Sequence, residues 1–86
     1  MPEISRFFGI VIKMYFGDHP PPHFHVEYGE FRAVVDIHTL TVIGGDLPPR
    51  ALGMVIEWAS QHQGELLDLW ERAAHYQPLY KIPPLL

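Results

Sequence analysis

The stretch that decides the fold is HFHVEYGEFRAVVDIH, residues 23–38. Apolar and polar side chains alternate on both sides of Gly29-Glu30, and a glycine in the first position of a two-residue loop is typical of a type II′ turn. The pattern predicts a β-hairpin in which His23 lies opposite Asp36. A slip by one residue would exchange the two faces of this hairpin. In the chosen register the core face carries Phe24, Val26, Tyr28, Phe31, Ala33, Val35 and Ile37.

A stiff loop, residues 17–22, precedes the hairpin and contains Asp18, His19 and three consecutive prolines. Each proline fixes its own φ and keeps the preceding residue out of the α region, so we expect an extended loop that presents Asp18 and His19 in a fixed pose. Residues 7–16 are rich in β-branched and aromatic side chains and predict the first strand. Residues 41–43 predict a short fourth strand.

Two apolar stripes with helical spacing follow within residues 48–75. A single helix over this range would be about 42 Å long, so we expect two helices, or one sharply bent helix, with a break near Gly64. Ser60 and Gln63 have the spacing of a capping box, and Asp46 is expected to accept backbone N–H groups at the first turn. Residues 77–86 are proline-rich but apolar, which predicts an extended tail that lies on the sheet, on the helices or on a partner.

These patterns together predict one α+β domain over residues 1–86. Its antiparallel β-sheet of three or four strands is expected over about residues 7–44, followed by two C-terminal helices over about 48–75 and the tail over 77–86. We expect the helices to pack on the apolar face of the hairpin. An apolar fraction of 48% is ordinary for a globular domain and argues against disorder.

Composition excludes several classes of protein. The chain has no cysteine, so it holds neither a disulfide framework nor a thiolate metal site. It has no signal-peptide pattern and no apolar run near the roughly 20 residues that a membrane helix needs, so we expect a cytoplasmic protein without a membrane. The net charge of −4 weighs against a free-standing nucleic-acid binder, because phosphate neutralisation needs a basic surface.

The polar face of the hairpin carries the candidate catalytic or metal-binding residues His23, His25 and Asp36. A His-x-His pair on a strand places both imidazoles on one side of the sheet. Directly opposed residues have Cβ atoms about 4.5–5.5 Å apart, so His23 and Asp36 are expected within hydrogen-bond reach. The candidate supporting residues are Lys13, Tyr15, Asp18, His19, Arg32 and His38.

Three functions fit this cluster. It is a two-histidine, one-carboxylate set of the kind that binds a divalent metal ion. It also suits acid–base chemistry on a phosphodiester, with His23 or His25 transferring a proton and Lys13 or Arg32 stabilising negative charge. Alternatively, the sheet face or the tail docks on another protein or on a second copy in a homo-oligomer. A structural alternative is that these are polar side chains on a solvated face.

Motifs spread along the chain also indicate a family. They are Ile4–Ile12, Met14–Phe16, Asp18-His19, Pro21–His25, Tyr28–Glu30, Gly45–Pro48, Arg50–Leu52, Glu57–Ala59, His62, Glu65–Leu67 and Trp70. In these the chain resembles a small bacterial family catalogued as domain of unknown function 4160, to which the D-H-x-P-P-H-x-H core is fairly specific.

The resemblance implies a small, stand-alone bacterial protein. Members are often encoded beside another family, domain of unknown function 2442, which suggests one component of a toxin–antitoxin-like pair. We therefore expect a protein that acts through a protein partner. The alternative is a metal-dependent or acid–base phosphodiesterase or nuclease that uses the histidine and aspartate cluster.

Overall fold

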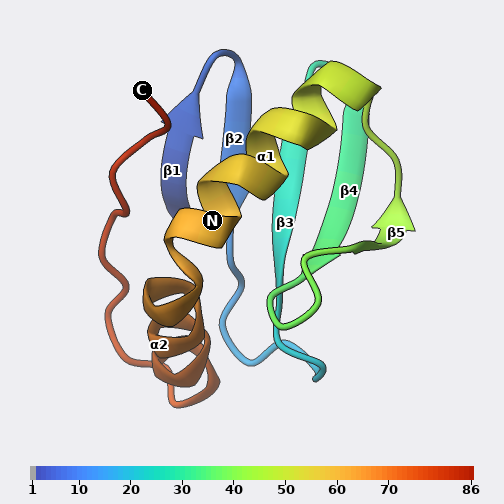
Figure 1. Cartoon of the computed structure of the whole chain (residues 1–86). Helices are drawn as coiled ribbons and strands as arrows, with labels where there is room; N and C mark the ends of the chain where they lie inside the picture. The colour runs from blue at the N-terminus through green and yellow to red at the C-terminus, as the bar shows by residue number, and fades with distance from the viewer. Residues whose placement is uncertain (1) are drawn as a thin grey trace.

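The computed structural model describes residues 2–86 and consists of one antiparallel sheet and two helices (Figure 1). The strands follow one another in the sheet in chain order, each antiparallel to its neighbours. They are β1 (Glu3–Phe7), β2 (Ile10–Lys13), β3 (His23–Tyr28), β4 (Phe31–Asp36) and β5 (Val42–Gly45), followed by the helices α1 (Pro49–Gln61) and α2 (Gln63–Ala74). The predicted α+β class and the order of strands before helices are confirmed.

The hairpin formed by β3 and β4 has the predicted register. His23 pairs with Asp36, His25 with Val34, and Tyr28 with Phe31. Gly29 opens the turn with a φ of 58°, a backbone region that a glycine enters without steric cost. The side chains predicted to face the core are buried or partly buried against it.

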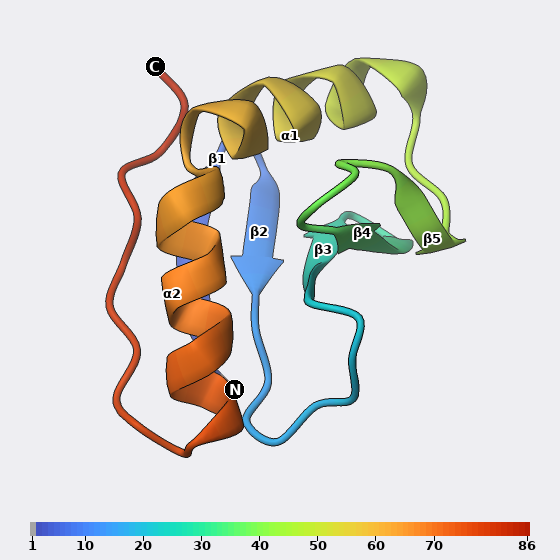
Figure 2. The ribbon, with the colours of Figure 1, turned by 60° about the horizontal axis from the view of Figure 1, so that its bottom comes forward.

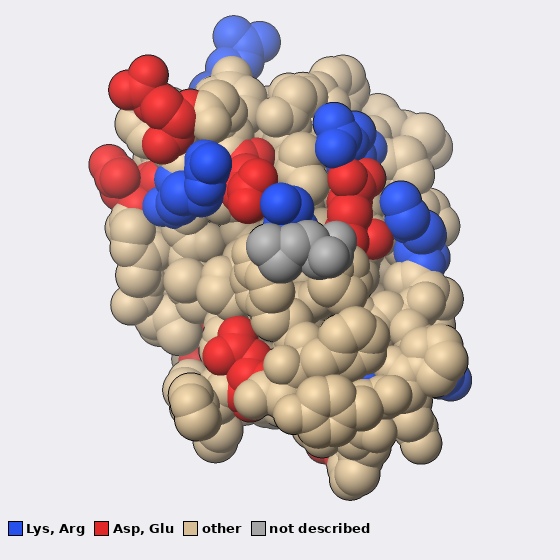
Figure 3. Space-filling view, turned by 180° about the vertical axis from the view of Figure 1, so that it is seen from behind, with Lys and Arg blue, Asp and Glu red and all other residues tan. Residues whose placement is uncertain are grey.

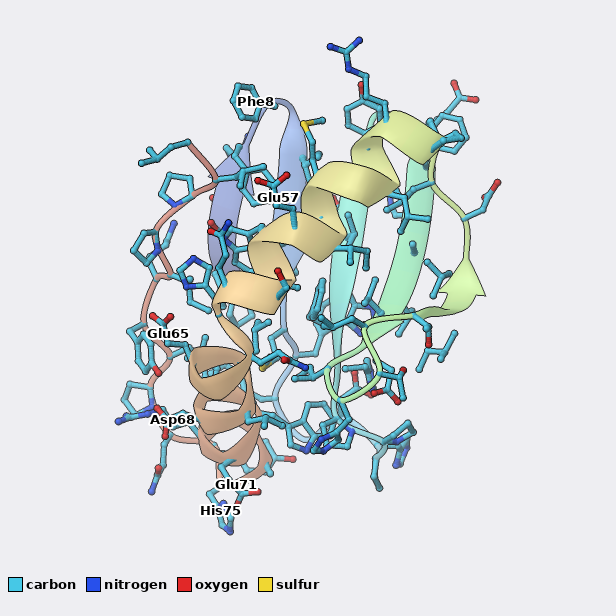
Figure 4. The ribbon with its side chains drawn as sticks, in the orientation of Figure 1. Phe8, Glu57, Glu65, Asp68, Glu71 and His75 are labelled. Carbon is cyan, nitrogen blue, oxygen red and sulfur yellow. The ribbon has the colours of Figure 1, made fainter. Side chains whose placement is uncertain are left out.

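The first predicted strand is wrong in its extent, because residues 7–16 do not form one strand. Residues 3–13 form a hairpin of β1 and β2, which gives five strands in place of three or four. The turn is at Phe8 and Gly9, with φ values of 49° and 80°. Two successive left-handed residues define the type I′ turn of tight hairpins, and the aromatic Phe8 concealed this signal in the sequence. Phe8 lies at the tip of the turn, where its side chain is exposed (Figure 4).

Both helices cover the same face of the sheet, and the other face stays open (Figures 1 and 2). The core between the two layers is centred on the fully buried Trp58, whose ring lies 5.5 Å from that of Phe7 and 5.9 Å from that of Phe24. Truncation of a buried aromatic residue of this kind costs about 3–5 kcal/mol. The core therefore holds the helices and the sheet in one arrangement.

The break between the helices falls at His62, two residues before the predicted position at Gly64. The predicted capping box is wrong, since the Ser60 hydroxyl donates to the Glu57 carbonyl within α1. Asp46 is not the cap of α1 either; Pro48 occupies that position without a side-chain bond. Neither helix within residues 2–86 has the length and apolar stretch that crossing a membrane requires.

The tail runs back along β1, at the edge of the sheet (Figure 1). Ile82 is buried, and its N–H donates to the Ile4 carbonyl at 2.8 Å. The indole N–H of Trp58 donates to the Pro83 carbonyl at 2.9 Å. The expectation that the tail lies on the sheet or on the helices is confirmed, and the tail covers an edge strand that would otherwise offer free backbone groups.

Candidate metal centre

One carboxylate oxygen lies at the centre of the candidate site. Oδ2 of Asp18 is 2.9 Å from Nε2 of His23 and 3.1 Å from Nε2 of His25. These three side chains offer one ligand atom each, and the three atoms lie within 4.8 Å of one another. The loop between β2 and β3 supplies the aspartate, and β3 supplies both histidines on one side of the strand.

The local sequence leaves Asp18 free to face the histidines. Its other oxygen, Oδ1, accepts the backbone N–H of His19 at 2.9 Å. The next three residues are prolines, which have no N–H to offer. Gly17, with a φ of 67°, donates its N–H to the Ala73 carbonyl of α2, and a side chain there would collide with the Tyr76 hydroxyl. The loop is thus anchored to α2, and Oδ2 is left for the imidazoles.

His23 is buried, and its hydrogen bonds define its protonation pattern. Nδ1 lies 2.6 Å from the Pro21 carbonyl. A carbonyl oxygen only accepts, so Nδ1 carries a proton and Nε2 of the neutral ring is an acceptor. This acceptor faces Asp18 Oδ2, which is also an acceptor. A positive species, either a proton or a metal ion, must lie between the two atoms.

The surroundings of the two histidines fix the positions of their rings. The His23 ring packs against Trp70 of α2 with a centroid distance of 5.0 Å. The His25 ring meets the Tyr15 ring edge-on at 4.5 Å and lies 5.1 Å from the His23 ring. Rings held in this way need little reorganisation when Nε2 binds a cation.

The charged form of Asp18 is favoured within this cluster. Burial acts to raise the pKa of the Asp18 carboxyl, but its contact with the His25 imidazole, the hydrogen bond from the His19 N–H and its contact with the His23 imidazole together hold that pKa below its usual range. An ionised carboxylate beside two imidazoles is the electrostatic arrangement that attracts a divalent cation.

The sequence placed Asp36 in this cluster, and the structure puts Asp18 there instead. Asp36 pairs with His23 across the two strands, yet Oδ1 of Asp36 accepts the backbone N–H groups of His38 at 2.7 Å and Thr39 at 2.9 Å. These hydrogen bonds hold the pKa of Asp36 below its usual range, and the bond from the Thr39 N–H has the largest effect. The chain reverses directly after β4, so this carboxylate serves its own turn.

The other predicted supporting residues divide into two groups. Lys13 and Arg32 lie on the open face of the sheet, where the Lys13 ammonium is 2.9 Å and the Arg32 guanidinium 3.8 Å from Oε2 of Glu27. Figure 3 shows cationic and anionic side chains alternating over this part of the surface. His19 and His38 are exposed, and only their backbone groups form hydrogen bonds among residues 2–86.

A pocket of about 250 Å³ adjoins the cluster on the open face of the sheet. His25 belongs to both, since one of its ring nitrogens faces Asp18 while the residue also lines the pocket. The sequence did not single out Glu27, Val34 and Gly44 as site residues, and all three line the pocket as well. The alternation that placed Glu27 and Val34 on the face of His25 was a signal for them.

The fold and the site thus define a small α+β protein with a candidate two-histidine, one-carboxylate metal centre at the start of β3, beside α2. The chain belongs to the family described as Domain of unknown function (DUF4160), whose model matches residues 9–71. The matched region includes all three residues of the cluster. Searches of the curated proteins and of the solved structures found no match to the chain.

Proposed function

We propose that this protein is a divalent-metal-dependent enzyme that hydrolyses phosphodiester bonds, with Asp18, His23 and His25 as the metal ligands. The observation that carries the proposal is the meeting of two acceptors, Nε2 of His23 and Oδ2 of Asp18, 2.9 Å apart. The N–H of His23 Nδ1 already donates to the Pro21 carbonyl. A metal ion satisfies both acceptors without placing an extra proton on a buried ring.

The spacing of the ligand atoms suits a first-row transition metal. Zinc ligands of the N and O type lie about 2.0–2.2 Å from the ion, which separates two tetrahedral ligand atoms by about 3.4 Å. The observed separations of 2.9 and 3.1 Å need to open only slightly. Two imidazoles and one carboxylate leave coordination positions for water and substrate, as in catalytic sites.

Such an ion lowers the pKa of bound water and stabilises negative charge on a phosphoryl group. In the hydrolysis, a bond forms between the water oxygen and phosphorus, the bond to the leaving oxygen breaks, and a water proton ends on that oxygen. Lys13 and Arg32, two cations against the single Glu27 carboxylate, favour an anionic substrate on this face. The overall charge of −4 favours a small substrate over a long duplex.

Acid–base chemistry without a metal is the competing explanation of the same geometry. In that case Nε2 of His23 carries a proton, and the imidazolium and Asp18 form an ion pair at 2.9 Å. Pairs of this kind lose much of their Coulombic gain to desolvation when they are buried, and His23 is buried. A metal ion is the stronger explanation, and elemental analysis separates the two.

The test is a metal and activity measurement on protein purified without a histidine tag. We expect Zn²⁺ or Mn²⁺ to copurify or to bind in calorimetry, and the loaded protein to cleave bis(p-nitrophenyl) phosphate. His23→Ala and His25→Ala should remove both properties, whereas the exposed histidine variant His38→Ala should keep them. Absence of binding by either metal, or equal binding by all variants, would contradict the metal centre. Metal binding without cleavage of any phosphodiester would contradict the reaction.

Action through a protein partner is a second candidate function, and it includes the bacterial cytoplasm as the location and the toxin–antitoxin-like pairing. It is supported by an exposed aromatic pair, Phe16 and Tyr76, whose rings stack at 6.2 Å. Tyr76 lies beside Gly17, the residue before Asp18, so a partner seated on this pair would lie next to the site. Light scattering and a pull-down with the product of the neighbouring gene test it; an inert monomer that captures nothing would remove it.

A further inference from the structure

The pocket beside the metal centre has the form of a binding site for a flat ring. Its boundary comes from the open face of three strands and from Tyr15 after β2. The residues that line it are Tyr15, His25, Val26, Glu27, Arg32, Ala33, Val34, Gly44 and Gly45. We propose that this pocket holds the base of a nucleotide whose phosphodiester lies at Asp18, His23 and His25. This substrate assignment rests on the proposed function.

The floor of the pocket stays open because Gly44 has no side chain. A Cβ atom at Gly44 would meet Val34 at 3.6 Å, an ordinary contact, so neither its backbone nor its packing requires glycine. Its neighbour Gly45 differs, because its φ is 68° and a Cβ atom there would collide with the Arg32 carbonyl. A larger residue at 44 would stand over Val34 and fill the space. The glycine at this position therefore preserves the pocket.

The polar groups of the pocket suit a nucleobase edge. The Oε2 atom of Glu27 accepts a hydrogen bond from Lys13 and pairs with the Arg32 guanidinium. No residue in 2–86 forms a hydrogen bond with its Oε1 atom. The bonds from Lys13 lower the pKa of Glu27, so the carboxylate is charged and only accepts. Every nucleobase carries an N–H or NH₂ donor on its edge, and a base can also lie on aromatic and apolar side chains.

The position of His25 connects the two parts of the substrate. Its Nε2 atom faces the metal centre, and the residue lines the pocket. The base and the phosphodiester would thus lie on either side of one imidazole, a separation that a single nucleotide spans. A volume of about 250 Å³ suits a base better than a longer oligonucleotide. The substrate class is therefore a small nucleotide or the end of a single strand.

The test fills the pocket without touching the metal ligands. The probes are the 5′-monophosphates of adenosine, guanosine, cytidine and uridine, with ribose 5-phosphate as the probe that lacks a base, titrated calorimetrically into the zinc-loaded full chain. We expect at least one nucleotide to bind more tightly than ribose 5-phosphate. Gly44→Val should weaken that nucleotide by about tenfold or more, and Gly44→Ala by less. The control is Gly53→Val in α1, where an added Cβ atom meets nothing within 4 Å.

The outcomes separate this proposal from the proposed function. Zinc bound with unchanged affinity by Gly44→Val, together with weaker nucleotide binding, supports the pocket. If ribose 5-phosphate binds as tightly as every nucleotide, or if both valine variants behave alike, the base does not occupy the pocket, although the metal centre stands. If the chain binds no zinc but binds a nucleotide, and Gly44→Val weakens that binding, the pocket assignment holds and the metal-dependent function fails.

Discussion

Two aspartates lie near histidines in this fold, and their carboxylates have different hydrogen-bond partners. Asp18 lies in the loop before β3, and its Oδ2 atom meets the imidazoles of His23 and His25. Asp36 ends β4, and its Oδ1 atom accepts the N–H groups of the turn that follows. The cross-strand register placed Asp36 opposite His23 as expected, yet the imidazole lies with the aspartate of the loop.

The difference comes from the backbone donors near each carboxylate. Aspartate readily hydrogen-bonds to backbone N–H groups one to three residues further on, which forms local turns. After Asp36, His38 and Thr39 supply such groups. After Asp18, only His19 does, because residues 20–22 are prolines. A run of prolines thus keeps an adjacent carboxylate available for a site.

The largest expected effect is the difference in zinc affinity between a chain that lacks the Asp18 carboxylate and one that lacks the Asp36 carboxylate. Asp18→Ala is expected to weaken zinc binding by more than about 100-fold, since even changes beyond the direct ligands cost about 10–100-fold. Asp36→Ala should leave zinc affinity unchanged, because its carboxylate serves the turn. Calorimetric titration of both variants measures the contrast. Equal losses of zinc affinity would mean that Asp36 moves to join the site, which would contradict its assignment to the turn after β4.

A new backbone N–H donor beside Asp18 should make this carboxylate behave more like that of Asp36. Pro20→Ala adds an N–H two residues after Asp18, the position that an Asx turn uses. This donor would compete for the carboxylate, and we expect zinc binding to weaken by about tenfold. Pro78→Ala in the tail is the matched control. Unchanged zinc affinity in Pro20→Ala would show that the prolines do not protect the carboxylate.

The contribution of the Asp36 carboxylate to stability should depend on pH. Its pKa is lowered in the folded protein, chiefly by the Thr39 N–H. A lowered folded pKa gives a stabilisation that is present above the unfolded value of about 3.9 and is lost as the pH falls through the folded value. Asp36→Asn should therefore be less stable than the natural chain near neutral pH, with a difference that shrinks in acid. Urea unfolding at several pH values measures it; a constant difference would contradict this origin.

The smallest effect is expected at His38. Its ring is exposed, and the group that Asp36 binds is the backbone N–H of His38, which alanine keeps. His38→Ala should change neither the thermal midpoint nor the affinity for zinc beyond experimental error. A marked loss of zinc affinity in this variant would mean that His38 reaches the site, and the contrast between the two aspartates would then be wrong.

Much of the fold was predictable because its signals are local. The alternation around Gly29 gave the register of β3 and β4, and the apolar tail residues indicated a packed segment. The turn at Phe8 and Gly9 was missed, since Phe8 adopts a φ of 49° that aromatic residues rarely take. The helix break was placed within two residues, but its capping box was wrong.

The site was predictable in part. His23 and His25 were identified from their spacing, and Asp18 only as a supporting residue. The choice between Asp18 and Asp36 depends on how the loop between β2 and β3 folds back, which neither spacing nor alternation describes. The pocket depends on Gly44 of β5 lying beside Val34, a contact between strands whose register has a bulge.

The amino-acid sequence by itself determined the hairpin register, the face that meets the helices and the supply of imidazoles, because alternation and turn residues act over a few positions. Only the tertiary structure decided which carboxylate reaches those imidazoles. Gly17 bonds to Ala73, and Trp70 packs on His23, so α2 holds the loop against the start of β3. These two contacts join residues that are 56 and 47 positions apart in the chain, and they arise from packing of the whole core.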